Sequence, residues 1–463
     1  MAPLRIWPRS LLLILAAGAA IRLSLWLLFA PSEPRIWDEN DYARLARTIA
    51  IHGEFGFEPG RPTSIRPPLY PAFVAGVYHL AGVDNYQMVR LAQALLSLVT
   101  VVVLYRLGLE VLSSERAALW TSALFCFYPS FLGYNNLILT EVLFTFWLVV
   151  GVYSLARALN RDRFSDLVVA GAVLALGALT RSVLWLLPPV LIPFLLLSCR
   201  GPATRRIFAA TLFSAAFALV IAPWAIRNTH LQRTFVPIDC MGGRNFMMGN
   251  YEYTPLYRSW DTISLEGQQS WIAELLAEHP QAASMTQGQI DQLALKEGIR
   301  FVREHPGLTL QRDVVKFFDF WGLERELIAG ADGGYFGPVN RPAIIILSLL
   351  IGSSYVLVLF AGAFGAAWSP PTDRRQHVLL LLVIGFICGA HTIVFAHSRY
   401  HLPVMPFVML YAAGAITGPR VCMRRQPAVW LAALFCIVVI VGWCWNGAAG
   451  DLSKLLRAFG LGQ

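Results

Sequence analysis

Long apolar runs separated by short, arginine-containing turns dominate the sequence. The first run covers residues 10–30, and others follow at roughly 86–112, 116–133, 137–157, 165–181, 183–199, 206–226, 342–367, 377–396, 402–418 and 428–446. Each run approaches the roughly 20 apolar residues with which a helix crosses the hydrocarbon core of a bilayer. The pattern therefore predicts an all-α polytopic membrane protein with about eleven transmembrane helices.

Two polar stretches interrupt this pattern, and they divide the chain into three parts. The first part, 1–226, contains the first apolar runs and a polar loop at 31–85; the second, 227–341, is polar throughout; the third, 342–463, is again apolar. Within the first loop, apolar residues recur from Tyr42 to Ala50 at the spacing of an amphipathic helix, with Arg44 and Arg47 opposite. Such a helix lies flat on a bilayer surface.

The 227–341 region also has helical rather than strand periodicity. Trp271, Leu275 and Leu276 share one stripe, and a second stripe follows between Ile290 and Val302. Prolines at 280 and 306 end these segments, because proline does not continue a helix. We expect amphipathic helices that form a cap on the membrane surface.

Charge and composition set the orientation of the chain. Only 14% of the residues are charged, against about 25% in soluble domains. The net charge of +9 lies in turns between apolar runs, which argues against nucleic acid as a partner. Alternate turns collect the following arginines: Arg106, Arg116, Arg157, Arg161, Arg163, Arg200, Arg205, Arg206, Arg374, Arg375, Arg420, Arg424 and Arg425. The positive-inside rule then places the N-terminus inside, and both polar stretches and the C-terminus outside the cytoplasm.

Two features of the apolar runs have alternative interpretations. The small residues at 16–20 resemble a signal-peptide cleavage region, but residues 23–30 extend the run to spanning length. Arg22 lies inside this run, where it is either a functional residue or a side chain that reaches back to the interface. The seven cysteines have no CxxC or metal-type spacing, so neither a disulfide framework nor a zinc site is indicated.

A cluster of carboxylates opens the first polar loop and is the strongest candidate for chemistry. Asp38, Glu39 and Asp41 lie between Trp37 and Tyr42, directly after the first apolar run. The loop closes with the sequence Arg66-Pro67-Pro68-Leu69-Tyr70-Pro71. Adjacent acids are commonly solvated charge or a helix start. Their position beside a membrane helix indicates instead a carboxylate cluster held at the level of the lipid head groups.

Other ionisable residues lie at the predicted outer ends of the apolar runs. Arg66, Arg181, Arg227 and Arg399 are either interfacial anchors or a convergent site for an anionic head group, because guanidinium binds phosphate through two hydrogen bonds. Glu141 opens the run at 137–157, where a carboxylate needs water or a cationic partner. His391, His397 and His401 are too loosely arranged to indicate a metal site.

Together these motifs resemble a known family. Asp38-Glu39, the Arg66–Pro71 sequence, Thr140-Glu141, Pro223-Trp224 with Arg227-Asn228, and Arg399-Tyr400-His401-Leu402-Pro403 resemble the polyprenyl-phosphate-sugar glycosyltransferases of the GT-C type. The branch is that of protein O-mannosyltransferases and lipid A aminoarabinose transferases. The resemblance implies a GT-C fold and transfer of a sugar from a lipid-phosphate donor on the outer leaflet.

The resemblance also implies roles for individual residues. Asp38 corresponds to the catalytic base and Glu39 to the residue that places the acceptor, and an acid near Glu141 lies close to the site. Arg66, Arg227 and Arg399 are the predicted ligands of the donor phosphate. Further site candidates in these motifs are Asp41, Tyr42, Tyr70, Glu141, Arg181, Tyr400 and His401. Asp41 replaces a basic residue of the aminoarabinose pattern, which speaks against that sugar specificity.

The chemistry of such a transfer agrees with these residue types. A phosphate leaving group needs charge stabilisation rather than a proton, so one carboxylate that takes the acceptor proton is sufficient. Arginines can offset the leaving charge, so no metal or other cofactor is required, and a single displacement inverts the anomeric carbon. The alternatives are a transporter, which usually shows paired halves with broken helices, and a non-catalytic lipid-binding assembly protein. The sequence identifies neither the sugar nor the acceptor.

Overall fold

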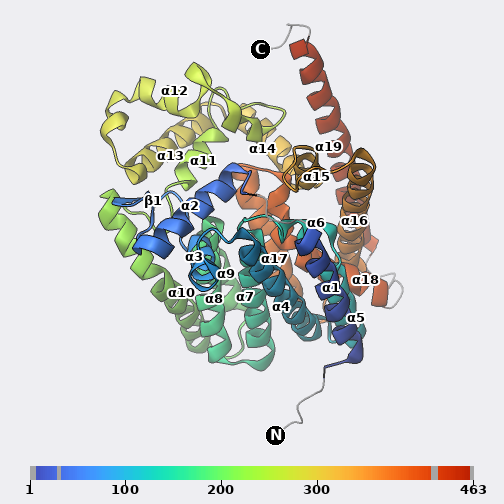
Figure 1. Cartoon of the computed structure of the whole chain (residues 1–463). Coiled ribbons are helices and arrows are strands. Elements are labelled where there is room, and N and C mark those ends of the chain that lie inside the picture. Colours follow the sequence, from blue (N-terminus) through green and yellow to red (C-terminus); the bar gives the residue numbers. More distant parts are fainter. Residues whose placement is uncertain (1–6, 29–32, 419–425, 459–463) are drawn as a thin grey trace.

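The computed structural model describes residues 7–28, 33–418 and 426–458, most of which lie in helices (Figure 1). Among these residues, eight helical segments are long and apolar enough to cross a membrane. They are α1 (Arg9–Leu28), α4 (Tyr86–Leu112), α7 (Glu141–Arg161), α10 (Ala203–Gln232), α16 (Arg341–Trp368), α17 (Arg374–Ile393), the segment Ser398–Thr417, made of the 3-10 helix η5 (Ser398–Val404) and α18 (Met405–Thr417), and the apolar part of α19 (Gln426–Ala458). The predicted all-α, multi-pass membrane protein is confirmed.

The described residues contain fewer helices of full spanning length than the eleven spans predicted. The runs at 165–181 and 183–199 form the shorter helices α8 (Phe164–Thr180) and α9 (Pro188–Ser198), the latter preceded by the 3-10 helix η1 (Ser182–Leu186). The run at 116–133 divides into α5 (Glu115–Cys126) and α6 (Pro129–Tyr134). Proline at the start of α6 and α9 explains these breaks, because proline fits the first turn of a helix but not its interior.

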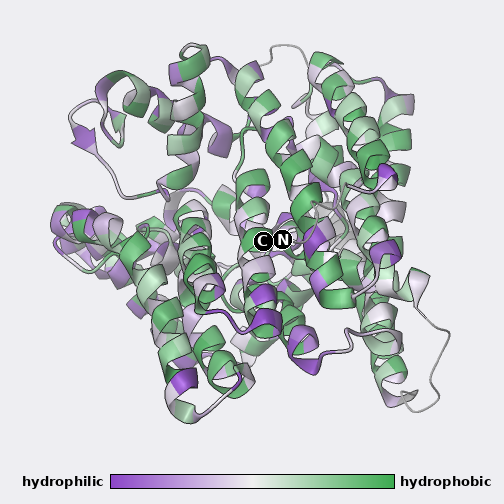
Figure 2. Ribbon diagram, turned by 90° about the horizontal axis from the view of Figure 1, so that it is seen from below, coloured by the Kyte–Doolittle hydropathy of each residue, from purple (hydrophilic) through white to green (hydrophobic). Residues whose placement is uncertain are grey.

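The membrane helices differ in how deeply they are buried. Figure 2 shows hydrophobic residues along most of the long helices, with hydrophilic residues concentrated in the connecting turns. α7 and the η5–α18 segment are the most buried of the spanning segments, whereas α1, α16 and α19 are the least buried. α7 packs against α4 and α8, and α18 packs against α16 and α5. The two most enclosed segments are therefore held on several sides.

Close backbone approach supports this packing. A Cβ added at Gly365 of α16 would lie 1.9 Å from the carbonyl oxygen of Tyr411 in α18, and one at Gly171 of α8 would lie 2.3 Å from that of Phe213 in α10. Small residues of this kind let membrane helices approach closely. Because these two glycines have no side chain, α16 can pack closely against α18, and α8 against α10.

Arg22 has a structural environment that neither sequence interpretation described. Its side chain is 2% exposed, so it does not reach the interface. The guanidinium donates to the carbonyl oxygen of Cys126 at 3.0 Å and to the hydroxyl of Ser97 at 3.0 Å. Arg22 therefore joins α1 to α5 and α4 inside the bundle.

The first polar loop contains α2 (Trp37–His52), a short hairpin of β1 (Gly56–Glu58) and β2 (Arg61–Pro62), and α3 (Leu69–Ala81). The predicted amphipathic helix is confirmed, and it starts earlier, at Trp37, so that the acidic cluster forms its first turn. Tyr42, Leu45 and Ala46 are buried, and α2 packs against α3. The apolar stripe thus faces protein rather than lipid. The sequence predicted a lipid-facing stripe because it gave no indication of α3.

The 227–341 region folds into short helices, as predicted. These are α11 (Gly242–Met248), η2 (Ser259–Ser264), η3 (Gly267–Gln269), α12 (Trp271–Glu278), η4 (Pro280–Ser284), α13 (Gln287–Glu304), α14 (Pro306–Phe320) and α15 (Glu326–Asp332). α11–α13 enclose a small core of Met247, Tyr251, Leu275 and Ala294. Figure 1 shows this region at the same end of the bundle as α2, opposite the start of α1.

The cap is tied to the first loop by specific hydrogen bonds. The side-chain oxygen of Gln287 accepts from the hydroxyl of Thr63 at 3.0 Å and from the backbone N–H of Ser64 at 3.1 Å. Both polar stretches therefore form one layer above the bundle. The predicted inner arginines Arg420, Arg424 and Arg425 lie outside the described residues.

Candidate active site

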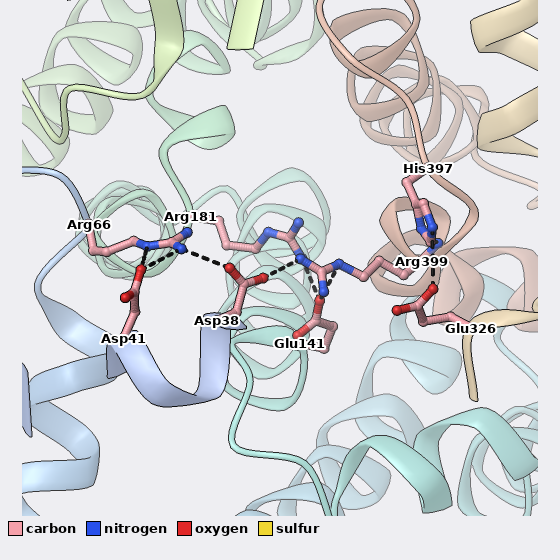
Figure 3. Close-up of polar contacts among 8 residues, drawn as sticks. All are labelled: Asp38, Asp41, Arg66, Glu141, Arg181, Glu326, His397 and Arg399. Carbon is pink, nitrogen blue, oxygen red and sulfur yellow. Dashed lines mark hydrogen bonds and ion pairs between the residues drawn. The ribbon is translucent and has the colours of Figure 1, made fainter. Parts of the chain in front are cut away.

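A row of alternating charges lies where α2 meets the ends of the membrane helices (Figure 3). Asp38 is at its centre: Oδ1 accepts from Nη2 of Arg66 at 2.8 Å, and Oδ2 accepts from Nη2 of Arg399 at 2.6 Å. Arg66 also donates to Asp41, from Nη2 at 2.8 Å and from Nε at 3.2 Å. Residues separated by more than 360 positions thus share one network.

Local helix geometry explains why two of the carboxylates contact the same arginine. Asp38 and Asp41 are three residues apart, which places them on one face of α2. Asp38 also lies in the first turn, where the helix dipole favours negative charge. Arg66 follows the hairpin that returns the chain from α2 toward α3. A single guanidinium can therefore bridge both acids.

Glu39 has a different environment from its neighbours. It is 2% exposed, and its Oε2 accepts from the backbone N–H groups of Arg35 at 3.0 Å and Ile36 at 3.2 Å. Its Oε1 accepts from the N–H of Ile138 at 2.8 Å. In this structure Glu39 caps α2 and fixes it to the turn before α7, and thereby helps to set the position of Asp38.

The far side of the row is formed by Glu141 and two arginines. Glu141 begins α7 and is 2% exposed; its Oε1 contacts Nη1 of Arg181 at 3.2 Å and Nε of Arg399 at 3.6 Å. Arg181 follows α8 and lies over the ring of Tyr400 at 5.0 Å. The sequence interpretation of Glu141 as the partner of an arginine at this surface agrees with these contacts.

The segment that carries Arg399 is held at both ends by buried histidines. The backbone N–H of Arg399 donates to Nδ1 of His397 at 3.2 Å, and Nε2 of His397 lies 3.4 Å from Glu326. Burial lowers the pKa of His397, against the opposing effect of Glu326. The Arg399 guanidinium also packs between Trp260 and Tyr400, at 5.6 and 5.7 Å from their ring centres.

His401 lies outside the charged row but anchors the same 3-10 helix. It is completely buried; Nδ1 donates to the carbonyl of Phe320 at 2.6 Å, and Nε2 lies 3.0 Å from Oε1 of Glu324. The same carboxylate accepts from the hydroxyls of Tyr128, at 3.0 Å, and Ser130. Glu324 thus links η5 to α6 and to the segment after α14.

Replacing Glu324 with alanine should destabilise the protein by about 1–3 kcal/mol, because it removes a buried hydrogen-bond acceptor and leaves His401 and the hydroxyl groups of Tyr128 and Ser130 unpaired there. The thermal unfolding midpoint of the detergent-purified protein measures the effect. Glu304→Ala removes an exposed glutamate at the end of α13 and should leave the midpoint unchanged. Equal midpoints for the two variants would contradict the anchoring role of Glu324.

Tyr42 and Tyr70 form the apolar side of the site. Arg66 lies 5.4 Å from the ring centre of Tyr42, which meets the ring of Tyr70 edge-on at 4.9 Å. The Tyr70 hydroxyl donates to Gln93 at 2.8 Å, and Gln93 in turn donates to the carbonyl of Leu137 at 2.8 Å. Burial raises the pKa of the Tyr42 hydroxyl to about 12, so the side chain remains neutral at neutral pH.

Arg227 is the one predicted phosphate ligand that the structure does not bring to the row. Its guanidinium donates to the carbonyl oxygens of Thr63 at 2.8 Å and Phe55 at 3.2 Å, and it lies over the ring of Trp224 at 4.5 Å. These contacts join α10 to the β-hairpin. The sequence placed Arg227 at the correct surface but could not show that backbone carbonyls occupy its donors.

The electrostatic state of Asp38 follows from two opposing effects. Burial disfavours its charged form, but Arg399 and Arg66 outweigh burial and hold the pKa of Asp38 below its usual range. Arg66 is buried, yet the pKa of its guanidinium is raised by Tyr42, Asp38 and Asp41. Asp38 and Arg66 are therefore both ionised at neutral pH.

The sequence analysis missed several residues of the site. Trp260, Glu324 and Glu326 come from the 227–341 region, which lacks a motif that would single them out. Asp239 lies in the loop after α10, near enough to Arg66 to feel its charge; burial raises its pKa to about 7 against the opposing effects of Ser182 and Arg66. Only packing brings these residues to the site, so no periodicity or spacing in the sequence could have indicated them.

One group elsewhere in the described residues has the spacing of metal ligands. Glu278, His279 and Glu297 lie together between α12 and α13 in the cap. Arg300 contacts Glu278 and lies 2.6 Å from Glu297, so a cation of the chain already pairs with both carboxylates. His397 and His401 face different glutamates rather than a common centre.

Comparison with known proteins identifies the fold. Residues 65–226 match the family described as dolichyl-phosphate-mannose-protein mannosyltransferase. The oligosaccharyltransferase of Archaeoglobus fulgidus, in its apo form, is structurally similar, with a TM-score of 0.51 and 15% identity over 95% of this chain and 55% of that chain. ArnT from Cupriavidus metallidurans bound to undecaprenyl phosphate has a TM-score of 0.43, with 14% identity over 86% of this chain and 77% of that chain. No curated protein matches the sequence.

These comparisons place the chain in a structural class. The chain has the GT-C fold, and the resemblance predicted from its motifs is confirmed. It spans about half the length of the archaeal oligosaccharyltransferase. The family match begins just before α3 and ends within α10, and so includes Arg66, Glu141 and Arg181.

Proposed function

We propose that the protein is a membrane glycosyltransferase that moves a sugar from a polyprenyl-phosphate donor to an acceptor on the extracytoplasmic face. The observation that carries this proposal is the position of Asp38 between Arg66 and Arg399. A carboxylate flanked by two guanidinium groups offers both groups that the reaction needs: a proton acceptor and cations for a phosphate. The family matched by residues 65–226 supports the same donor class.

In the proposed reaction Asp38 accepts the proton of an acceptor hydroxyl as the acceptor oxygen bonds to the anomeric carbon. The bond between that carbon and the phosphate oxygen breaks, and its electron pair leaves with the polyprenyl phosphate. Arg66 and Arg399 offset the charge that develops on this leaving group. Attack and departure on opposite faces of the sugar invert the anomeric carbon.

The direct test uses the purified protein in lipid with a panel of polyprenyl-phosphate sugars and candidate acceptors. Release of free polyprenyl phosphate, together with a product heavier than the acceptor by one sugar, is the expected result. A transporter moves the donor without cleaving it, and a non-catalytic binder retains it. Binding without any cleavage across the panel would therefore exclude the transferase.

The proposed reaction requires no metal, because the two arginines supply the positive charge at the phosphate. We expect sugar transfer to continue unchanged after treatment with a chelator such as EDTA. Loss of transfer on chelation, with recovery after a divalent cation is added back, would show that the arginines are insufficient. A chelator already saturated with calcium serves as the control.

We also propose that the end of the bundle carrying α2 and the cap is extracytoplasmic. In a cysteine-free background, a cysteine at Gln268 in η3 should react with a membrane-impermeant maleimide in intact cells. A cysteine at Arg163, in the turn between α7 and α8 at the opposite end, should react only after lysis. Both positions are exposed, so access to the reagent decides the result. The reverse pattern would invert the proposed orientation.

The 227–341 region contributes Trp260 and Glu326 around Arg399. We propose that this region lies on the acceptor side of the site, since the donor lipid must enter from the bilayer below. The acceptor itself is a hydroxyl of a protein, a lipid or a glycan.

A further inference from the structure

Both oxygens of the Asp38 carboxylate are engaged in ion pairs. Oδ1 contacts Arg66 at 2.8 Å and Oδ2 contacts Arg399 at 2.6 Å. Each of these arginines has a second acidic neighbour, Asp41 for Arg66 and Glu141 for Arg399. The two cations assigned to the donor phosphate are thus already neutralised by carboxylates of the chain itself.

The same contacts make Asp38 a weak proton acceptor. Although burial favours its neutral form, the two arginines keep its pKa below the usual range. A general base works best when its pKa lies near the operating pH. The arrangement that makes a good anion site therefore suppresses the base at its centre.

There is also little separate space for a phosphate beside Arg399. The cavity that Arg399 lines together with Tyr134, Glu324, Glu326, Leu327, Ser398 and Leu402 measures about 10 Å³. This volume accommodates about one water molecule. A phosphate that reaches both arginines must therefore displace a group that now contacts them, and Asp38 is the group that lies between them.

We propose that, without donor, the Asp38 carboxylate occupies the binding position of the donor phosphate between Arg66 and Arg399. When the donor binds, its phosphate displaces the carboxylate, and Asp38 is then free to act as the base. This inference rests on the proposed function, in which these residues serve the same reaction. A phosphate can compete with the Asp38 carboxylate for this position, because it presents several oxygens to guanidinium groups that bind bidentately. Removal of the acceptor proton is thereby coupled to the presence of the donor.

The competition leads to a result opposite to the usual effect of altering a binding site. Asp38→Asn removes the competing charge but preserves the shape of the side chain. If Asp38 occupies the phosphate position in about nine-tenths of the wild-type molecules or more, the variant should bind a short-chain prenyl phosphate with a dissociation constant at least about tenfold lower than that of the wild type. Isothermal titration calorimetry on protein in lipid nanodiscs measures this affinity.

Asp41→Asn is the matched control, because it removes the same charge from the same face of α2. It relieves only Arg66, since no contact joins Asp41 to Arg399. We expect a smaller gain in affinity than with Asp38→Asn. Equal gains would show a general effect of net charge and would overturn the proposal, as would unchanged or weaker binding by Asp38→Asn.

A measurement on the wild type does not depend on how the variant folds. The carboxylate infrared band of Asp38 should shift from an ion-paired to a less constrained position when the prenyl phosphate binds, and Asp38→Asn identifies the band. A wild-type spectrum without a carboxylate change on binding would overturn the displacement. The two proposals fail separately: a wild-type protein that cleaves no donor across the panel removes the proposed function, whereas an active wild type with an Asp38→Asn variant that binds no tighter removes only the displacement.

Discussion

Asp38→Asn should reduce sugar transfer by about 10²–10⁴-fold, which is the usual contribution of a general base. The asparagine keeps the size of the side chain, but its amide does not take the acceptor proton at neutral pH. Because the variant frees Arg66 and Arg399, the donor should still bind. Initial rates with saturating donor and acceptor, measured on protein reconstituted in lipid, therefore report the loss of the base.

Asp84→Asn is the matched control for this variant. Asp84 precedes α4 and pairs with Arg47 on the exposed face of α2, outside the charged row. Asp84 has a positive φ of 61°, a conformation that asparagine tolerates. The control should transfer sugar at the wild-type rate. Similar losses in both variants, or a folded Asp38→Asn protein with near wild-type turnover, would contradict the assignment of Asp38 as the base.

Arg399→Lys should reduce transfer by about 10²–10³-fold, comparable to the loss of one donor that stabilises a transition-state charge. Lysine keeps the positive charge but not the planar fork, so it cannot contact Asp38 through one nitrogen and face Glu141 through another. The side chain of Arg399 is only 10% exposed, so water does not readily replace the lost contacts. Both kcat and donor affinity should fall, as steady-state kinetics with varied donor can show.

Two further lysine variants separate this effect from the loss of any arginine. Arg47→Lys changes an exposed arginine of the same loop and should be neutral. Arg227→Lys removes contacts to the carbonyls of Thr63 and Phe55, so it should lower the thermal unfolding midpoint rather than donor affinity. If Arg399→Lys keeps full activity and donor affinity, Arg399 is only an interfacial anchor.

Periodicity predicted most of the helices because the bilayer restricts the backbone structures that a chain can adopt within it. A chain in hydrocarbon must satisfy its backbone hydrogen bonds internally, so long apolar runs form helices whatever their neighbours are. The run at 86–112 corresponds to α4 at both ends. The prediction was weaker where proline interrupts a run, as before α6 and α9, and it overlooked α3, whose 13 residues are too few to span.

The candidate site was predicted in part for a similar reason. Charged residues at the ends of apolar runs are costly and few, so Asp38, Arg66, Glu141 and Arg399 stood out from composition and position. The sequence grouped Arg227 with them because all lie at one surface. Depth in a membrane can be read from a sequence, whereas lateral position within that surface depends on how the helices pack.

The sequence by itself determined that the protein is an all-α multi-pass membrane protein, the approximate positions of its membrane helices and the charged residue types at the helix ends. These properties follow from the local match between apolar length and bilayer thickness. Tertiary structure alone decided that Asp38 bridges Arg66 and Arg399, that Glu39 caps α2, and that Trp260 and Glu326 complete the site. Each of these contacts joins segments far apart in the chain, and such contacts depend on which helix faces pack together.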